Sequence, residues 1–418
     1  MVNVLSDEAR ILCHRERAYL VMDRLGLDAL CVSDPRNVLY LSNFDCNLMW
    51  NWSWTAFAIL PRDRQRPPTL VCSSLDLPSL ITNPTWMPAV ETYVLHEQGT
   101  GEAVATKFRP NMREDARLGP FEREALALYD TTPTIRAPTP EDILRAVMEK
   151  LGLTSRIVGF DDMRLALRLK GNLAGLTLRD ARDVMREIRL IKTPAEIDRL
   201  REAAQRNERA LGAAIAATHE GVLWEEVVQA YAIALIREGG RPIYLIRGAG
   251  EQARVRLQET DYPIRRGELV FYDGLGQYRR YHGDIGRTAF VGEAPADVRR
   301  VFDAVRAGWA EGHARVRPGM RASELAILIR DTMRAHGYPT GPARAAAPHA
   351  LGLEHFDHPQ DRGFYQDFTI EVGCVLNVDM PYIEFGWGSL HLEDTIVVRR
   401  DGPEFLTSNK TDLIEIAG

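Results

Sequence analysis

Cysteine is scarce in this sequence, and the few that occur do not form a recognisable framework. The five residues are odd in number and widely spaced, and no Cys-x-x-Cys pair is present: Cys13, Cys31, Cys46, Cys72 and Cys374. This pattern does not favour a disulfide scaffold or a cysteine-rich zinc site. Isolated reduced thiols are typical of the cytoplasm, so a cytoplasmic protein is expected.

Long apolar runs and an excess of positive charge are also absent. No uncharged apolar run reaches the roughly 18 residues that span a bilayer, and the first eight residues lack the pattern of a secretory signal. The net charge of −6 provides no basic field, so neither nucleic acid nor a membrane is expected as a partner. A Gly-x-Ser-x-Gly motif is missing as well, which leaves a serine hydrolase without support.

Length and composition indicate a globular protein with more than one domain. The chain has 418 residues, of which 45% are apolar and 26% charged, and a chain of this length commonly divides into two domains. In the first half, apolar strands at 29–33, 69–72 and 156–160 alternate with other segments. This alternation predicts an α/β domain over residues 1–178.

A helix start marks the second half. Thr193-Pro194-Ala195-Glu196 combines an N-cap threonine, a proline in the first turn and a glutamate three residues after the cap. We therefore expect a second domain over residues 179–418. After this helix we expect helices at 223–238, 296–315 and 322–336, a strand ending at 247, and strands at 269–273, 283–291, 374–381 and 390–398. Since helices and strands are partly segregated, the predicted class is α+β.

Four acidic residues of this second half fall inside apolar strands, where a charge needs a partner. They are Asp273, Asp284, Asp379 and Glu393. An ionised carboxylate that is buried without a partner is very costly, and too few lysines lie nearby to neutralise four of them. Two divalent ions would balance four carboxylates and one neutral imidazole. His349, within Ala-Pro-His-Ala-Leu-Gly, is the best candidate for that imidazole.

At these residues the sequence resembles the creatinase/prolidase/aminopeptidase P superfamily. Asp273-Gly, followed eleven residues later by Asp284-Ile-Gly-Arg-Thr, is similar to the paired-aspartate motif of that family, and the order Asp, Asp, His, acid, Glu also matches. The segments 188–196 and 37–43 resemble the family's catalytic-domain opening and first-domain signature. The resemblance implies a pita-bread catalytic domain, an N-terminal α/β domain with a ribonuclease H-like sheet, and a homodimer.

The resemblance also implies roles for the ligands and a reaction. Asp284 and Glu393 would bridge two divalent ions (Mn, Fe, Co or Zn), Asp273 would hold one of them, and His349 with Asp379 the other. Two adjacent ions activate water and polarise a carbonyl. The expected activity is a dinuclear metal-dependent hydrolase that cleaves a C–N bond (amide, peptide or amidine) in a small substrate.

Three positions depart from the family's peptidases. Asp379 replaces a glutamate, and Arg256, in the strand expected before the first aspartate, replaces a histidine. A second family histidine falls at Phe356, which His355 and His358 flank. We therefore expect a small carboxylate-bearing amide or similar zwitterion as substrate, with weak activity at most on Xaa-Pro dipeptides.

Proton transfer and stabilisation of the reaction intermediate are expected from Asp379 and from the nearby histidines. Either His355 or His358 would replace the family histidine. His391 precedes Glu393 by two residues on the same strand, so both side chains point to one face. For His391, a role at the metals and a plain core role remain open.

Further residues are expected around this centre. Arg287 would pair with a ligand carboxylate, and Arg247 or Arg256 would bind a substrate carboxylate in bidentate geometry. Three tryptophans alternate as one face of a strand would, and form either a core stripe or a substrate wall over the partner subunit's site: Trp50, Trp52 and Trp54.

Two other functions stay open beside the hydrolase. One is a non-peptidase enzyme on the same scaffold, a lyase or ring-opening hydrolase acting on a small zwitterionic metabolite, because fold alone does not determine the reaction. The other is an inactive binding module, against which the complete set of five ligands argues.

Overall fold

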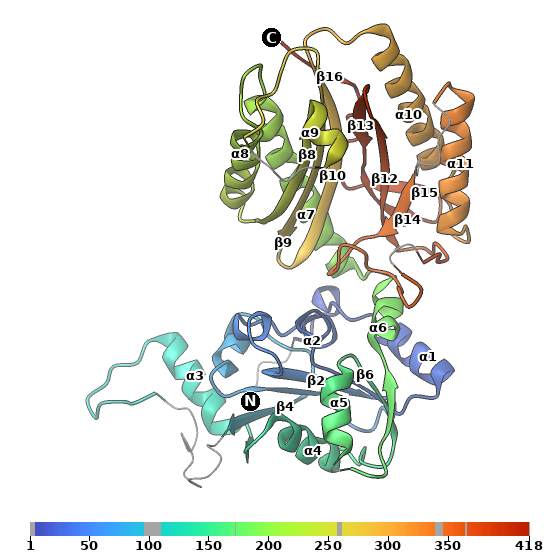
Figure 1. Ribbon diagram of the computed structural model, residues 1–418. Helices are drawn as coiled ribbons and strands as arrows, with labels where there is room; N and C mark the ends of the chain where they lie inside the picture. The colour runs from blue at the N-terminus through green and yellow to red at the C-terminus, as the bar shows by residue number, and fades with distance from the viewer. Residues whose placement is uncertain are drawn as a thin grey trace. The chain divides into compact units, whose positions relative to one another are not determined.

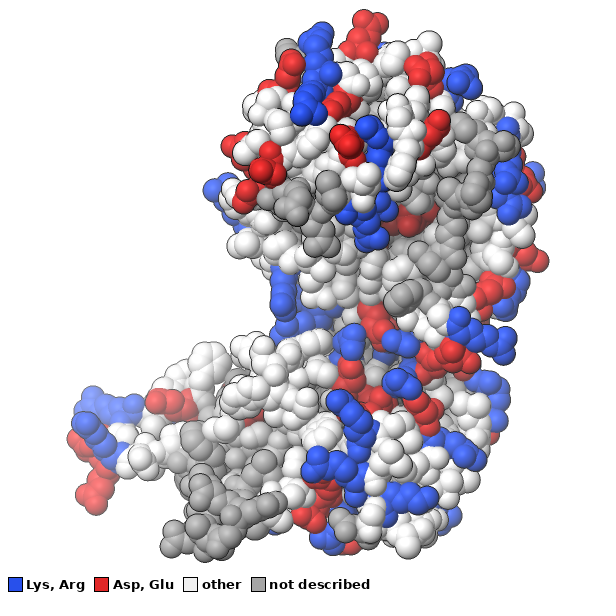
Figure 2. Space-filling model, viewed as in Figure 1, with Lys and Arg blue, Asp and Glu red and all other residues white. Residues whose placement is uncertain are grey.

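The computed structural model describes residues 5–95, 110–171, 173–256, 261–338, 346–363 and 366–417 (Figure 1). The chain divides into two compact units, Met1–Arg189 and Leu190–Gly418. Lys and Arg side chains are mixed with Asp and Glu over the visible face of each unit (Figure 2), so neither sign of charge dominates it. Within the described ranges, no helix has both the length and the apolarity needed to cross a membrane.

A seven-stranded mixed sheet forms the centre of the first unit. Its strand order is β5-β4-β3-β2-β1-β6-β7, in which β2 is antiparallel to β1 and β3 and the other neighbours are parallel. The strands are β1 (Ala29–Val32), β2 (Ala56–Pro61), β3 (Thr69–Ser73), β4 (Ala89–Leu95), β5 (Thr134–Ala137), β6 (Ile157–Phe160) and β7 (Thr177–Asp180). The alternation of strands and helices predicted for this half is therefore confirmed.

Helices flank this sheet in Figure 1. They are α1 (Arg15–Leu25), α2 (Pro35–Ser42), α3 (Pro120–Thr131), α4 (Pro140–Lys150), α5 (Met163–Lys170) and α6 (Arg182–Arg189), with short 3-10 turns η1 (Glu8–Arg10), η2 (Leu48–Trp50) and η3 (Leu77–Ile81). Apolar residues of α4 and α5 pack with those of the central strands in one buried core.

The first unit extends past the predicted boundary at residue 178. β7 pairs with β6, and α6 buries Met185 and Ile188. The guanidinium of Arg189 is almost fully buried and donates to the side chain of Asn37 on α2. Helix α6 is thus the last helix of the first unit, and the division lies between it and the helix start predicted at Thr193.

Two sheets with two pairs of helices build the second unit. One sheet has the order β16-β10-β9-β8, and the other β11-β12-β14-β15 with β13 paired to β12. The strands are β8 (Arg241–Ala249), β9 (Leu269–Tyr278), β10 (Tyr281–Val291), β11 (Ala347–Ala350), β12 (Val375–Glu384), β13 (Gly388–Leu392), β14 (Thr395–Arg399), β15 (Gly402–Phe405) and β16 (Ile414–Ile416).

Each helix pair covers one of these sheets. Helices α7 (Pro194–Ala217) and α8 (Trp224–Arg237) pack on the first sheet, and α10 (Ala296–Arg315) and α11 (Ala322–Ala335) on the second (Figure 1). The capping box at Thr193 and Glu196 begins α7 as predicted, and the helices expected near 223–238, 296–315 and 322–336 are confirmed. The short helix α9 (Gly250–Val255) was not predicted.

Candidate metal centre

The five predicted ligands come from strands of both sheets. Asp273 lies on β9 and Asp284 on β10, and the antiparallel register pairs Asp284 with Leu275, so both aspartates point to the same face. His349 lies on β11 and Asp379 on β12, which are also paired. Glu393 follows β13, and its bridge to Gly286 on β10 joins the two sheets. The ligands therefore meet where the sheets join.

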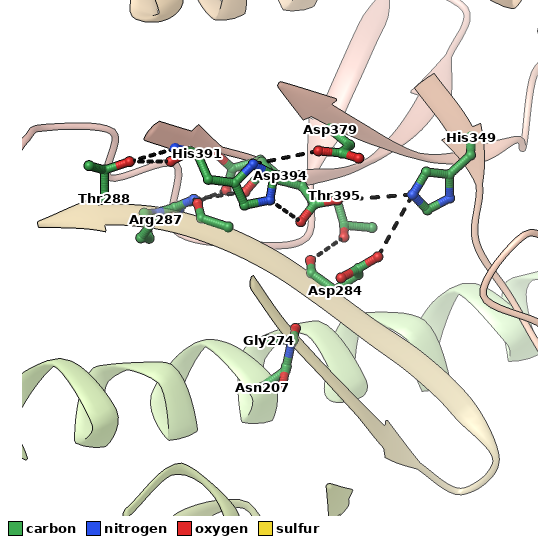
Figure 3. Close-up of polar contacts among 12 residues, drawn as sticks. Asn207, Gly274, Asp284, Arg287, Thr288, His349, Asp379, His391, Asp394 and Thr395 are labelled. Carbon is green, nitrogen blue, oxygen red and sulfur yellow. Dashed lines mark hydrogen bonds and ion pairs between the residues drawn. The ribbon is translucent and has the colours of Figure 1, made fainter. Parts of the chain in front are cut away.

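The side chains of four of them, with two further histidines, form two adjacent groups of potential ligand atoms. One contains Asp284, His349 and His355, and the other Asp273, His391 and Glu393; within each group the atoms lie within 4.8 Å of one another. His349 Nε2 lies 3.8 Å from Asp284 Oδ2 and 4.0 Å from Glu393 Oε1, so the groups adjoin (Figure 3).

Asp379 lies beside these groups rather than within either of them. Its Oδ1 is 3.5 Å from His391 Nδ1 (Figure 3). The shorter side chain of aspartate, compared with the glutamate of family peptidases, is consistent with this offset. Its role as a metal ligand remains a prediction.

The charges at this centre repel one another. Burial, and then the neighbouring carboxylate of Asp284, raises the pKa of Asp273 to about 7, and burial raises the pKa of Asp379 to about 6. Burial and Asp284 also raise the pKa of Glu393 well above its ordinary value. Burial alone would raise the pKa of Asp284 too, but His355 keeps that pKa below its ordinary value.

This donor set fits divalent cations. Burial lowers the pKa of His349 to about 3, so its imidazole is neutral and able to coordinate a metal. Asp284 Oδ1 and His391 Nδ1 are buried and make no hydrogen bond within the described part of the chain. Buried polar atoms normally have a partner, and positive ions among the carboxylates would supply one and remove the repulsion.

Of the three candidate catalytic histidines, two lie in the ligand groups and one lies outside them. His355 Nε2 lies 2.9 Å from Asp284 Oδ2, and His391 Nε2 lies 3.2 Å from Glu393 Oε2. His358 instead packs its ring against Phe368, with centroids 4.7 Å apart, and belongs to neither ligand group.

Arg287 is near the centre, but its partner differs from the prediction. It pairs with Asp394 at 2.8 Å rather than with a ligand carboxylate. Its other nitrogen, Nη1, donates to the main-chain oxygens of Gly286 and Glu393. Sequence reasoning missed Asp394, which is fully buried directly after Glu393. The available signal was its position between the predicted ligand Glu393 and the β-branched run at 395–398.

Arg247 lies on β8 in a rare backbone conformation, with φ of 88°. Its guanidinium is partly buried, 5.4 Å from the ring centre of Phe271. Burial and Arg256 lower the pKa of Arg247, against the pull of Asp273 and Asp379. Among the described residues, it forms no ion pair with a carboxylate within 4.0 Å.

Arg256 does not lie on a strand, contrary to the prediction. It is exposed, at the end of helix α9, with φ of 55°. Gly248 and Gly250 have positive φ angles, which turn the chain out of β8 and into the helix.

The tryptophan segment does not form a strand either. Trp50 ends the 3-10 turn η2, and Trp54 has φ of 61°. Trp50 Nε1 donates to Asp45, and Trp54 Nε1 donates to Asp162, whereas Trp52 is 60% exposed. All three indoles line a cavity of about 550 Å³ in the first unit. The segment turns instead of forming one apolar face because the indole N–H groups need hydrogen-bond partners.

Comparison with known proteins identifies the second unit. Residues 198–400 match the metallopeptidase family M24. The Xaa-Pro dipeptidase of Pyrococcus furiosus is 27% identical over 235 residues, covering 56% of this chain and 67% of that protein. The Xaa-Pro dipeptidase of Pyrococcus horikoshii is 27% identical over 271 residues, covering 64% and 75%.

A solved structure extends the likeness over nearly the whole chain. The Xaa-Pro dipeptidase from Bacillus anthracis has a TM-score of 0.70 at 19% identity, covering 96% of this chain and 98% of that chain. This likeness confirms the fold expected from the sequence. The second unit belongs to the metallopeptidase family M24, which confirms the metal-dependent hydrolase expected from the resemblance to the creatinase/prolidase/aminopeptidase P superfamily.

Proposed function

We propose that the protein hydrolyses the C–N bond of a small substrate with a free carboxylate, an Xaa-Pro dipeptide or a closely related amide. The observation that carries the proposal is the partly buried Arg247, which forms no ion pair within the described residues, although the charges of Asp273 and Asp379 act on its pKa. The relatives named above are Xaa-Pro dipeptidases, whose substrates end in a carboxylate. On this ground the proposal includes Xaa-Pro dipeptides, for which the sequence alone predicted weak activity at most.

The side chains of the centre have separate tasks in this reaction. Asp273, Asp284, His349 and Glu393 would hold two divalent ions, with Asp379 as a further ligand. Ions bound there would polarise the scissile carbonyl and activate water. Asp379, on the rim of the ligand groups, takes up a proton and returns it to the leaving nitrogen.

Arg247 and His355 orient the substrate. The guanidinium of Arg247 binds the carboxylate with two parallel hydrogen bonds, held in place by the ring of Phe271. His355, which is partly exposed beside Asp284, donates a hydrogen bond to the oxygen that becomes negative.

The test compares two substrates that differ only in charge. For Ala-Pro, Arg247→Ala should lower kcat/KM by about 10- to 150-fold, the equivalent of a hydrogen bond to a charged group. For Ala-Pro amide, which lacks the carboxylate, the same variant should change kcat/KM little.

Arg256→Ala is the matched control, because Arg256 is the other predicted arginine but is exposed. Equal losses on both substrates would contradict the role of Arg247. Failure of the wild-type protein, loaded with Mn, Fe, Co or Zn, to cleave either substrate would favour the non-peptidase alternative.

We further propose that the protein is a cytoplasmic homodimer in which the tryptophan segment of each copy borders the partner's active site. The exposed indole of Trp52 and the cavity beside it support this arrangement, and the five buried, unbridged cysteines support a reducing compartment. Light scattering should return twice the chain mass of 47.1 kDa. Trp52→Ala should raise KM without changing the metal content, and a fully active monomer would contradict the proposal.

A further inference from the structure

The two ligand groups each contain an imidazole, although the family resemblance supplied only one. His391 shares one group with Asp273 and Glu393, and His349 shares the other with Asp284. The side chain of His391 is almost completely buried. Its Nε2 lies 3.2 Å from Glu393 Oε2, and its Nδ1 lies 3.5 Å from Asp379 Oδ1 (Figure 3).

Packing and hydrogen bonds with neighbouring residues hold His391 in this position. Its ring stacks face to face on Phe271, with centroids 4.4 Å apart and planes inclined by 6°. On its other side lies Gly286, where a Cβ atom would come within 2.1 Å of His391 Cδ2. The backbone of His391 is held by Thr288, whose hydroxyl bonds both its N–H and its carbonyl.

The contacts of the two ring nitrogens point to a cation. A neutral imidazole carries one N–H and one lone pair, yet both nitrogens of His391 face carboxylate oxygens. One lone pair would therefore face a carboxylate oxygen that also carries lone pairs. Ligand atoms of Asp273, His391 and Glu393 lie within 4.8 Å of one another, a spacing at which one cation could contact all three. A cation coordinated by the lone pair satisfies the ring and the carboxylates together.

We propose that His391 is a ligand of one of the two metal ions, together with Asp273 and Glu393. Each ion then has an imidazole of its own, His391 for one and His349 for the other. Asp379, whose Oδ1 lies 3.5 Å from the other ring nitrogen, would orient the ring once an ion is bound. The inference rests on the metal dependence of the protein and not on the identity of its substrate.

The first experiment uses the wild-type protein loaded with zinc. X-ray absorption at the zinc edge counts the imidazoles bound per metal. With two zinc ions per chain, the proposal expects at least about one imidazole per zinc, and a value near one half, from His349 alone, would overturn it. Failure to bind metal at all would instead contradict the metal centre as a whole.

The second experiment assigns the imidazole to His391. In the double variant His349→Ala/His355→Ala loaded with Cu(II), pulsed electron paramagnetic resonance should still detect imidazole nitrogen at the copper. Adding His391→Ala should abolish that signal. Copper bound by the double variant without imidazole nitrogen would overturn the proposal.

Metal titration provides a third measure with a matched control. His391→Ala should weaken binding of one ion by at least about tenfold and leave the other unchanged. His313→Gln removes another buried histidine, on α10 and outside both ligand groups, and should leave both affinities unchanged. Two unchanged affinities in His391→Ala would refute the proposal, and a circular dichroism spectrum like that of the wild type verifies folding.

Discussion

Replacing Asp394 by alanine should lower the free energy of unfolding of the second unit more than a comparable replacement of an exposed residue. The carboxylate is fully buried and accepts hydrogen bonds from Arg287 at 2.8 Å, Trp309 at 3.0 Å and Thr407 at 2.6 Å. Its removal leaves the buried Arg287 with only the more distant carboxylate of Glu208, at 4.0 Å, as an ion-pair partner. Breaking a buried ion pair in this way costs about 3–5 kcal/mol, and the two lost neutral donors increase that cost.

Urea unfolding followed by circular dichroism measures this effect. For a unit of this size we expect the midpoint of its transition to fall by about 1 M or more. Asp303→Ala is the matched control, because Asp303 pairs with Arg306 on the exposed side of α10. Exposed pairs contribute at most about 1 kcal/mol, so the control should shift the midpoint little.

The milder variant Asp394→Asn connects stability to the metal centre. Arg287 donates to the main-chain oxygen of Glu393 at 2.7 Å, so loosening the pair displaces a predicted ligand. We expect metal affinity to fall by about 10- to 100-fold. An Asp394→Ala protein with wild-type stability and wild-type metal affinity would refute this reasoning.

Three further predictions concern the second unit. Asp284→Ala should lose both metal ions and all activity, as metal analysis and assay would detect, and retention of two ions would contradict its bridging role. Gly286→Ala should displace the ring of His391 and lower kcat/KM at least about tenfold, because the added Cβ would lie 2.1 Å from it; wild-type kinetics would show that the ring can move freely. Burial raises the pKa of Glu196 from 4.5 to about 8, so its contribution to stability is complete below pH 4.5 and is lost as pH rises through 8. Glu196→Gln should therefore flatten the stability profile between these pH values, measured by urea unfolding at each pH, whereas an unchanged profile would refute the assignment.

The predicted order of the metal ligands rests on local signals. Acidic residues inside apolar strands, such as Asp273 and Asp284, need a partner wherever the strands lie, since burial makes a lone carboxylate costly. The capping box at Thr193 is equally local, and it places the start of α7 correctly.

Other features depend on contacts that sequence spacing does not contain. The helix at 250–255 and the turns around Trp54 follow from positive φ angles and from hydrogen bonds to distant partners, such as Asp162. The alternation of Trp50, Trp52 and Trp54 therefore did not indicate a strand, and the strand expected at Arg256 was wrong as well. The boundary after Arg189 likewise depends on packing of α6 onto the first unit.

By itself the sequence determined the family and the metal-binding chemistry and predicted five ligands in their order, because each of these follows from residue type and spacing. Only the tertiary structure decided which side chains face one another. It paired Arg287 with Asp394 and placed His391 beside Glu393 and Asp379. These neighbours come from different strands of two sheets, and their distances depend on register and on the ring of Phe271, which no local pattern encodes.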